Sequence, residues 1–207
     1  MKTRRGMRDA RRLRSRRIRA LLASGLVLGV GAGVTLAAWN DSEYGAASFT
    51  TGQFGIQGST VTNPSVFSDH GAGAPATLAF APSAQLSALA PGNTVYALFS
   101  VRTITPSVAG AVTMQGATLS GALTALQYGV KLIPAATVCD ATSYAASTTV
   151  LVAAGSALTV GAAAQTLLAN GGNQLNYCFA VSLPVGADNT TQNQSVTATW
   201  QFAAVSS

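Results

Sequence analysis

Four segments after residue 90 alternate apolar and polar residues with a period of two, at residues 95–102, 126–132, 176–183 and 195–202. This alternation is typical of β-strands that bury one face and expose the other. The apolar positions are Val95, Ala97, Phe99 and Val101; Leu126, Tyr128, Val130 and Leu132; Tyr177, Phe179, Val181 and Leu183; and Val196, Ala198, Trp200 and Phe202. We expect one shared core, in which Trp200, Phe202, Phe179, Val181, Phe99 and Val101 are buried together.

Shorter apolar runs at residues 76–80, 111–119 and 148–152 are further strand candidates. Turn-forming residues separate the segments, among them Asn63-Pro64, Pro91-Gly92 and Asn170-Gly171. Residues 162–169 are predicted to form a short helix, and residues 59–75 a loop. About eight short strands indicate an all-β fold, an antiparallel sandwich of the jelly-roll or Greek-key type.

The first 37 residues have a different pattern. Residues 1–19 hold ten of the 12 Lys and Arg residues, and residues 20–37 are apolar and uncharged. Small residues close this stretch at Thr35, Ala37 and Ala38. This order predicts a signal peptide, a basic n-region at 1–19 and an apolar h-region at 20–37, cleaved after Ala37 or one residue later. Residues 38–207 would then form a single β-sandwich domain, secreted or held at the cell surface.

Two alternatives stay open for this segment. An uncleaved signal would act as a membrane anchor, since its apolar run is just long enough to span a bilayer. The protein would then contact the membrane only through that signal. Ser15-Arg16-Arg17 also loosely matches a twin-arginine signal, so the export route is not decided by the sequence.

Residues around the predicted cleavage site resemble the exported proteins processed by SipW-type signal peptidases, the TasA and camelysin-like family. The resemblance is carried by Thr35, Ala37, Ala38, Trp39, Asp41, Phe49, Gly52 and Phe54, and more weakly by Leu89-Ala90-Pro91-Gly92. It implies processing by a SipW-type peptidase and a jelly-roll fold. It also implies that the mature N-terminal segment can complete the sheet of the next subunit, producing a homopolymer in extracellular fibres or biofilm matrix. Trp39 and Asp41 could equally serve processing alone.

The net charge changes sign when the predicted signal peptide is left out. The whole chain has a net charge of +6, but residues 38–207 carry only Arg102 and Lys131 against five acids, a net charge of −3. The domain therefore lacks the basic surface that nucleic-acid binding requires. Its charged fraction, about 4%, is far below the roughly 25% of ordinary soluble domains. The predicted strands at 93–102 and 194–205 have one charge between them, so as sheet edges they would be poorly protected.

The two cysteines, Cys139 and Cys178, both lie in the predicted exported part. An oxidising compartment favours pairing, so we expect one disulfide. Cys178 lies on the opposite face of its predicted strand from Tyr177 and Phe179, where it would reach a loop containing Cys139. Two thiols and one histidine do not supply a zinc site, and we expect no metal and no cofactor.

Catalytic motifs are nearly absent. His70 is the single histidine, in Ser68-Asp69-His70, without a nucleophile-elbow pattern or an H-E-x-x-H motif. A camelysin-like metallopeptidase would need more ligands than this chain offers, so we expect a protein that is not an enzyme. The main hypothesis is a structural protein that assembles by donating residues 38–56. The alternative is a monomeric surface adhesin or carbohydrate-binding module, with Tyr96 and Tyr144 as the few candidate contact residues.

Overall fold

The computed structural model describes residues 4–34, 41–62, 65–86 and 88–207. Two compact units divide the chain, residues 1–49 and residues 50–207. In the first unit, helix α1 spans Arg4–Val34 and covers the predicted basic region and most of the predicted apolar region. Residues 41–49 have neither helix nor strand.

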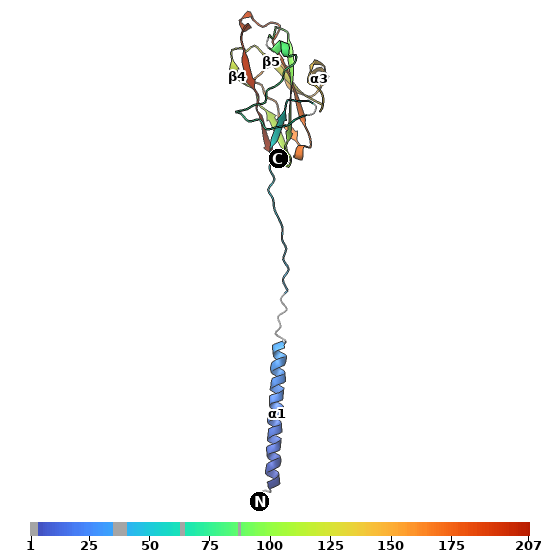
Figure 1. The fold of residues 1–207 in the computed structure, drawn as a ribbon, viewed down its shortest axis with the longest axis vertical. Coiled ribbons are helices and arrows are strands. Elements are labelled where there is room, and N and C mark those ends of the chain that lie inside the picture. Colours follow the sequence, from blue (N-terminus) through green and yellow to red (C-terminus); the bar gives the residue numbers. More distant parts are fainter. Residues whose placement is uncertain (1–3, 35–40, 63–64, 87) are drawn as a thin grey trace. The chain divides into compact units, whose positions relative to one another are not determined.

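The second unit is an all-β domain, shown in Figure 1 with its strands and its short helix α3. Its strands are β1 (Ile56–Ser59), β2 (Thr94–Thr103), β3 (Gly110–Met114), β4 (Thr118–Gly121), β5 (Gln127–Ile133), β6 (Val150–Ala157), β7 (Gln165–Leu167), β8 (Leu175–Ser182), β9 (Val196–Thr199) and β10 (Phe202–Ser206). Short helical segments are α2 (Ser83–Leu86), α3 (Ala141–Ala146), and the 3-10 turns η1 (Ala169–Gly171) and η2 (Asn189–Thr191).

The strands form antiparallel sheets in a sandwich-like arrangement. One layer has five strands in the order β1-β2-β8-β5-β6. The other layer contains β10-β3-β7 and the pair β4-β9. A hydrogen bond from the Gln115 amide to the Gln201 carbonyl, 2.8 Å long, continues the pairing between these two groups. Every pair of strands in the described residues is antiparallel.

The core lies between the layers and confirms the predicted burial faces. Phe99, Val101, Phe179 and Val181 are buried in one apolar cluster, and Trp200 and Phe202 pack against it while partly exposed. The rings of Phe179 and Trp200 are 5.0 Å apart, and those of Phe99 and Phe202 are 4.8 Å apart. Period-two alternation therefore identified the inward side of β2, β5 and β8 correctly.

A second, smaller cluster lies on the outer face of the five-stranded layer. The predicted disulfide is present there, with the Cα atoms of Cys139 and Cys178 5.4 Å apart. Both cysteines are buried together with Leu98 and Ile133. Helix α3 lies beside β5 on the side of the domain opposite β4 (Figure 1). The disulfide thus holds the α3 loop against β8.

Several predicted elements differ from the structure. Residues 162–169 do not form a helix, because Leu167 is fully buried and β7 pairs with β3. Tertiary packing here outweighs the helix propensity of the alanines. Residues 76–80 form no strand, although Leu78 and Phe80 pack on the core.

Two predicted runs are each split into two strands. The run at 195–202 is divided into β9 and β10 on either side of Trp200 and Gln201. The run at 111–119 is divided into β3 and β4. Because these strands pair with one another, both runs break at the same level of the sheet.

Candidate functional site

The residues of the predicted cleavage site, Thr35, Ala37, Ala38 and Trp39, lie outside the described residues. Of the other residues in the junction motif, Asp41 and Phe49 are exposed. Phe49 is 94% exposed, and so is the nearby Tyr44. Two aromatic side chains this accessible leave apolar surface available to a binding partner. Residues 44–52 are also uncharged, which makes this segment the first candidate site.

Hydrogen bonding between this part of the chain and the β domain begins at Gln53. The Gln53 carbonyl accepts a 2.9 Å hydrogen bond from the Val108 amide, and its side-chain amide donates to the Pro106 carbonyl at 2.8 Å. Two residues later the Gly55 carbonyl accepts from the Ile104 amide at 3.0 Å. From Ile56 the chain continues as β1, paired with β2 of the same sheet.

The other two motif residues also contact this domain. A Cβ added to Gly52 would lie 2.8 Å from Val108 Cγ1, and one added to Gly110 would lie 2.6 Å from the Phe54 ring. Glycine at these positions lets Gly52 and the Phe54 ring pack closely on the domain. Within this chain, residues 53–56 of the expected donated segment, residues 38–56, bond to their own domain. Among the described residues, 41–52 make no hydrogen bond to the domain, and Gly52 is where the segment begins to pack on it.

Uncharged sheet edges are available in the domain. In the five-stranded layer β2 is an inner strand, flanked by β8 on one side and by β1 and the Ala81 bridge on the other, so it is not a sheet edge in this chain. The far edge of that layer is β6, and β10 is an edge of the second layer. Neither β6 nor β10 contains a charged residue. Edges of this kind can accept an added strand.

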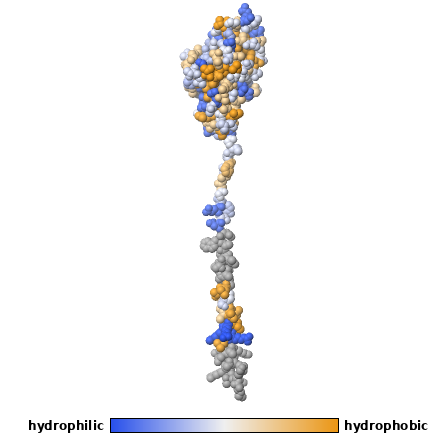
Figure 2. Space-filling model, turned by 180° about the vertical axis from the view of Figure 1, so that it is seen from behind, coloured by the Kyte–Doolittle hydropathy of each residue, from blue (hydrophilic) through white to orange (hydrophobic). Residues whose placement is uncertain are grey.

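The surface of the β domain also includes apolar side chains. Figure 2 shows strongly hydrophilic residues scattered over the visible face of the β domain, with apolar residues gathered near its middle. Val150, on the edge strand β6, is 53% exposed, and Val205 on β10 is 69% exposed. Both edge strands therefore present apolar side chains as well as unprotected backbone.

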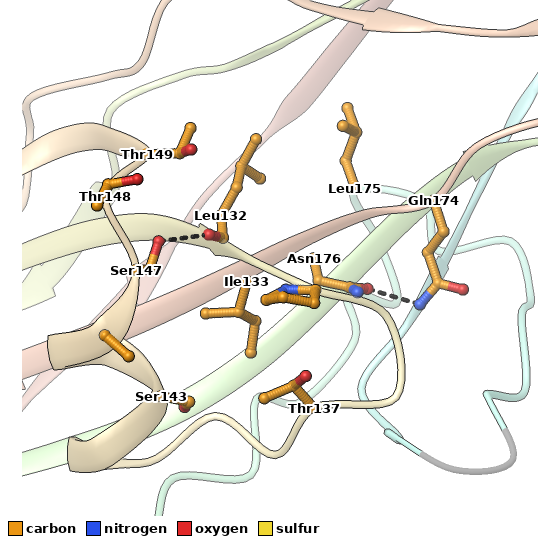
Figure 3. A pocket seen from close by; sticks show the side chains of 12 residues that line it. Leu132, Ile133, Thr137, Ser143, Ser147, Thr148, Thr149, Gln174, Leu175 and Asn176 are labelled. Carbon is orange, nitrogen blue, oxygen red and sulfur yellow. Dashed lines mark hydrogen bonds between the residues drawn. The ribbon is translucent and has the colours of Figure 1, made fainter.

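A pocket of about 570 Å³ lies beside α3 (Figure 3). Residues with hydroxyl groups from the turn between α3 and β6 stand on one side of it, and Gln174 stands on the other. The Ser147 hydroxyl donates to the Leu132 carbonyl at 2.6 Å, and the Gln174 amide donates to Asn176 Oδ1 at 2.6 Å. Much of the polar lining is therefore engaged within the chain, and no aromatic side chain lines the pocket.

Tyr96 and Tyr144, the candidates for a saccharide platform, lie over the disulfide cluster. Their rings are 5.8 Å apart and tilted, and the Lys131 ammonium sits 4.8 Å from the Tyr144 ring centre. Burial raises the pKa of both tyrosines. The two rings are packed against each other and are partly buried, so they do not offer a flat exposed stacking surface.

The single histidine lies edge-on to Phe99, with ring centres 6.4 Å apart, and also contacts a serine. His70 Nε2 lies 3.2 Å from the Ser68 hydroxyl, and both residues are exposed. The pocket beside α3 includes neither of them. Within the described residues, no further group hydrogen-bonds to the His70 ring, whereas a Ser–His nucleophile needs a third group to orient the imidazole. We interpret the contact as a local bond of this loop.

No group of three or more His, Cys, Asp or Glu side chains in the described part of the chain is arranged to hold a metal ion. Among the helices of that same part, none is both long and apolar enough to cross a bilayer. No family model matches the chain, and a comparison with curated proteins finds no match.

Proposed function

We propose that the protein is exported and acts as a structural component of the cell surface or extracellular matrix, where copies assemble by donating residues 41–52 to a sheet edge of a neighbour. The observation that carries this proposal is the exposed segment with Tyr44 and Phe49, which ends where bonding to its own domain begins. The TasA-like junction motif supports it, and with it we assign the sandwich to the jelly-roll type.

Strand donation fits the physical properties of both partners. An extended segment added to an open edge gains backbone hydrogen bonds, and its alternate side chains supply anchors. Residues 44–52 have no charge to desolvate, and Phe49 supplies an aromatic anchor. A contact in which the tail of one copy binds the edge of the next is head-to-tail and does not close, so it generates filaments.

Export is the first part of the proposal. The basic and apolar order of residues 1–37 supports a signal, and the disulfide suits an oxidising compartment. N-terminal sequencing of protein recovered from the medium should begin at Ala38 or Trp39. Recovery only in membranes, with residues 1–37 intact, would contradict cleavage and support the anchor.

Assembly is tested with a chain that begins at Gln53, because this deletion keeps every described hydrogen bond of the domain. The mature chain should form filaments in electron micrographs and sediment as a polymer. The shortened chain should remain folded but not form filaments. Adding a peptide of residues 41–52 should raise its unfolding free energy with concentration, by about 2.7 kcal/mol at one hundred times the dissociation constant.

A point variant distinguishes strand donation from non-specific hydrophobic association. Phe49→Ala should weaken assembly, whereas Val185→Ala, which truncates an 84% exposed side chain elsewhere, should not. A mature chain that stays monomeric at high concentration, or a shortened chain that polymerises equally well, would overturn strand donation. The monomeric adhesin or carbohydrate-binding module would then be the better account.

A further inference from the structure

A second pocket, of about 650 Å³, opens between the two layers at one end of the sandwich. Its walls come from both layers and from the loops at that end, and are largely apolar. The central wall residues are Leu89, Val95, Leu126, Val181, Leu183 and Trp200. The volume lies within the roughly 300–1,000 Å³ range of small-molecule sites.

This pocket is an opening of the main core. Val95, Val181 and Leu183 are 1%, 6% and 4% exposed, so the floor is core material. Leu89, Leu126 and Trp200 pack against the same core but stay partly accessible. Apolar surface left in water costs about 25 cal/mol per Å², so an apolar occupant that covers these side chains is stabilised.

The residues at the rim determine which polar group of a ligand can bind at the mouth of the pocket. The rim is formed by the loop between β8 and β9, whose contribution includes Asn189, Gln192, Asn193 and Gln194. These are neutral amides, able both to donate and to accept hydrogen bonds. Asp188 is the one charged residue in the lining, and its carboxylate accepts from the Thr190 amide at 2.9 Å as the cap of η2.

Anionic ligands find no partner at this site. The pocket lining contains no Lys, Arg or His. Arg102 and Lys131, the cations of the domain, are used elsewhere: the Arg102 guanidinium lies 4.0 Å from the Phe67 ring centre and Lys131 donates to the Ser147 carbonyl at 2.8 Å. A carboxylate or phosphate would have to approach Asp188 without any compensating positive charge.

We propose that this pocket binds a neutral amphiphile, with an acyl or alkyl chain among the apolar walls and an uncharged hydroxyl- or ester-bearing head at the amide rim. The site stands apart from strand donation, since none of its lining residues belongs to the donated segment. A failure of assembly would leave it intact, and its own failure would leave assembly intact.

Trp200 makes the test direct. The chain has two tryptophans, Trp39 and Trp200, so the mature chain carrying Trp39→Phe reports on this wall alone. The probe is monododecanoylglycerol, added below its micelle concentration, with dodecanoate as the chain-matched anionic comparator. We expect a saturable change in Trp200 fluorescence with the neutral probe, and binding at least about tenfold weaker with dodecanoate.

Filling the pocket should abolish the response. Ala198, on β9, lines it, and Ala198→Leu should weaken binding about tenfold or more. The matched control is Ala153→Leu on the exposed face of β6, which should bind as the unchanged protein does. If Ala198→Leu lowers the melting temperature strongly, Ala187→Leu, in the rim loop, replaces it.

Three results would overturn the proposal. A neutral probe that gives no saturable signal overturns the proposal, and so does dodecanoate binding as tightly as the neutral compound. Equal binding by the filled variants and by Ala153→Leu would show adsorption elsewhere on the surface, which also overturns it.

Discussion

At the scale of single residues, the aromatic side chains between the layers dominate the core. Phe179 on β8 is fully buried, with ring centres 6.4 Å from Tyr128 and 5.0 Å from Trp200. Trp200 is less enclosed, because it also forms a wall of the end pocket. The Trp200 indole N–H lies near the Tyr128 hydroxyl without meeting hydrogen-bond geometry, and that hydroxyl instead donates to the Val160 carbonyl.

Truncating Phe179 should therefore be among the most costly changes. We expect Phe179→Ala to lower the unfolding free energy by about 3–5 kcal/mol, through lost burial and the cavity left behind. Phe49→Ala makes the same chemical change at a 94% exposed position and should leave the unfolding free energy of the monomer nearly unchanged. Denaturant titration of both variants measures the difference. Equal effects would show that the assignment of the core is wrong.

Tyr177 provides a pH-dependent prediction. Its hydroxyl is buried without a hydrogen-bond partner among the described residues, and burial raises its pKa above the ordinary value of 10.0. The fold thus favours the neutral hydroxyl. This contribution is complete below pH 10.0 and is lost as the pH rises through the folded pKa.

Tyr177→Phe should accordingly shift the midpoint of alkaline unfolding to higher pH. At neutral pH it should be neutral or stabilising by about 1 kcal/mol, since it removes an unpaired buried oxygen. Tyr44→Phe, at an exposed position, serves as control. Circular dichroism and phenolate absorbance, followed against pH, give both quantities. An unchanged alkaline midpoint would rule out ionisation of Tyr177 as a cause of unfolding.

At the scale of elements, close backbone contacts explain where strands break. Between β3 and β4 the Ala117 amide donates to the Leu158 carbonyl at 2.8 Å, and the Met114 carbonyl accepts from Ala162 at 2.8 Å. Gly116 lies between these bonds, where an added Cβ would be 1.8 Å from the Thr159 carbonyl oxygen. Only glycine allows this approach without a backbone shift.

We expect Gly116→Ala to cost about 1–3 kcal/mol or more, as overpacking against a backbone atom does. Gly71→Ala is the control, because no atom lies within 4 Å of its added Cβ. Thermal melts of the two variants decide the matter. Equal melting temperatures would show that the backbone around Gly116 and Thr159 is less closely packed than in the structure.

Helix α3 was not predicted from the sequence, although hydrogen bonds between neighbouring residues stabilise its N-terminus. Asp140 accepts from the Ser143 amide at 2.8 Å, and the Ser143 hydroxyl accepts from the Asp140 amide at 3.0 Å, which together form a capping box. These bonds lower the pKa of Asp140, chiefly the one from the Ser143 backbone. The spacing of Asp140 and Ser143 in the sequence fits a capping box. A helix of six residues, however, is too short for hydrophobic periodicity to predict.

At the scale of the whole molecule, the disulfide connects parts of the chain 39 residues apart. It stabilises largely by restricting the unfolded chain, by about 4 kcal/mol for a loop of this length in the chain-entropy model. The double variant Cys139→Ala with Cys178→Ala should lose an amount of this order in denaturant unfolding. Thiol titration of denatured exported protein should find no free thiol. An unfolding free energy unchanged in the double variant would contradict the constraint.

The sequence alone determined the features that depend on local composition. Period-two alternation at residues 95–102, 126–132 and 176–183 predicted three strands and their buried faces, because a strand's side chains alternate whatever its neighbours are. The pairing of Cys139 and Cys178 followed from their number and their predicted compartment. The expected signal rests on composition in the same way.

Only the tertiary structure decided what depends on neighbours distant in sequence. Residues 162–169 became β7 and a turn because Leu167 fills the core beside β3. The junction segment divided at Gln53 because the Val108 and Ile104 amides lie in reach of its carbonyls. The end pocket was not foreseeable from any run of residues, since Leu89, Leu126 and Trp200 meet only when the two layers close. Alternation gives each side chain a face, and the packing of the layers decides what that face contacts.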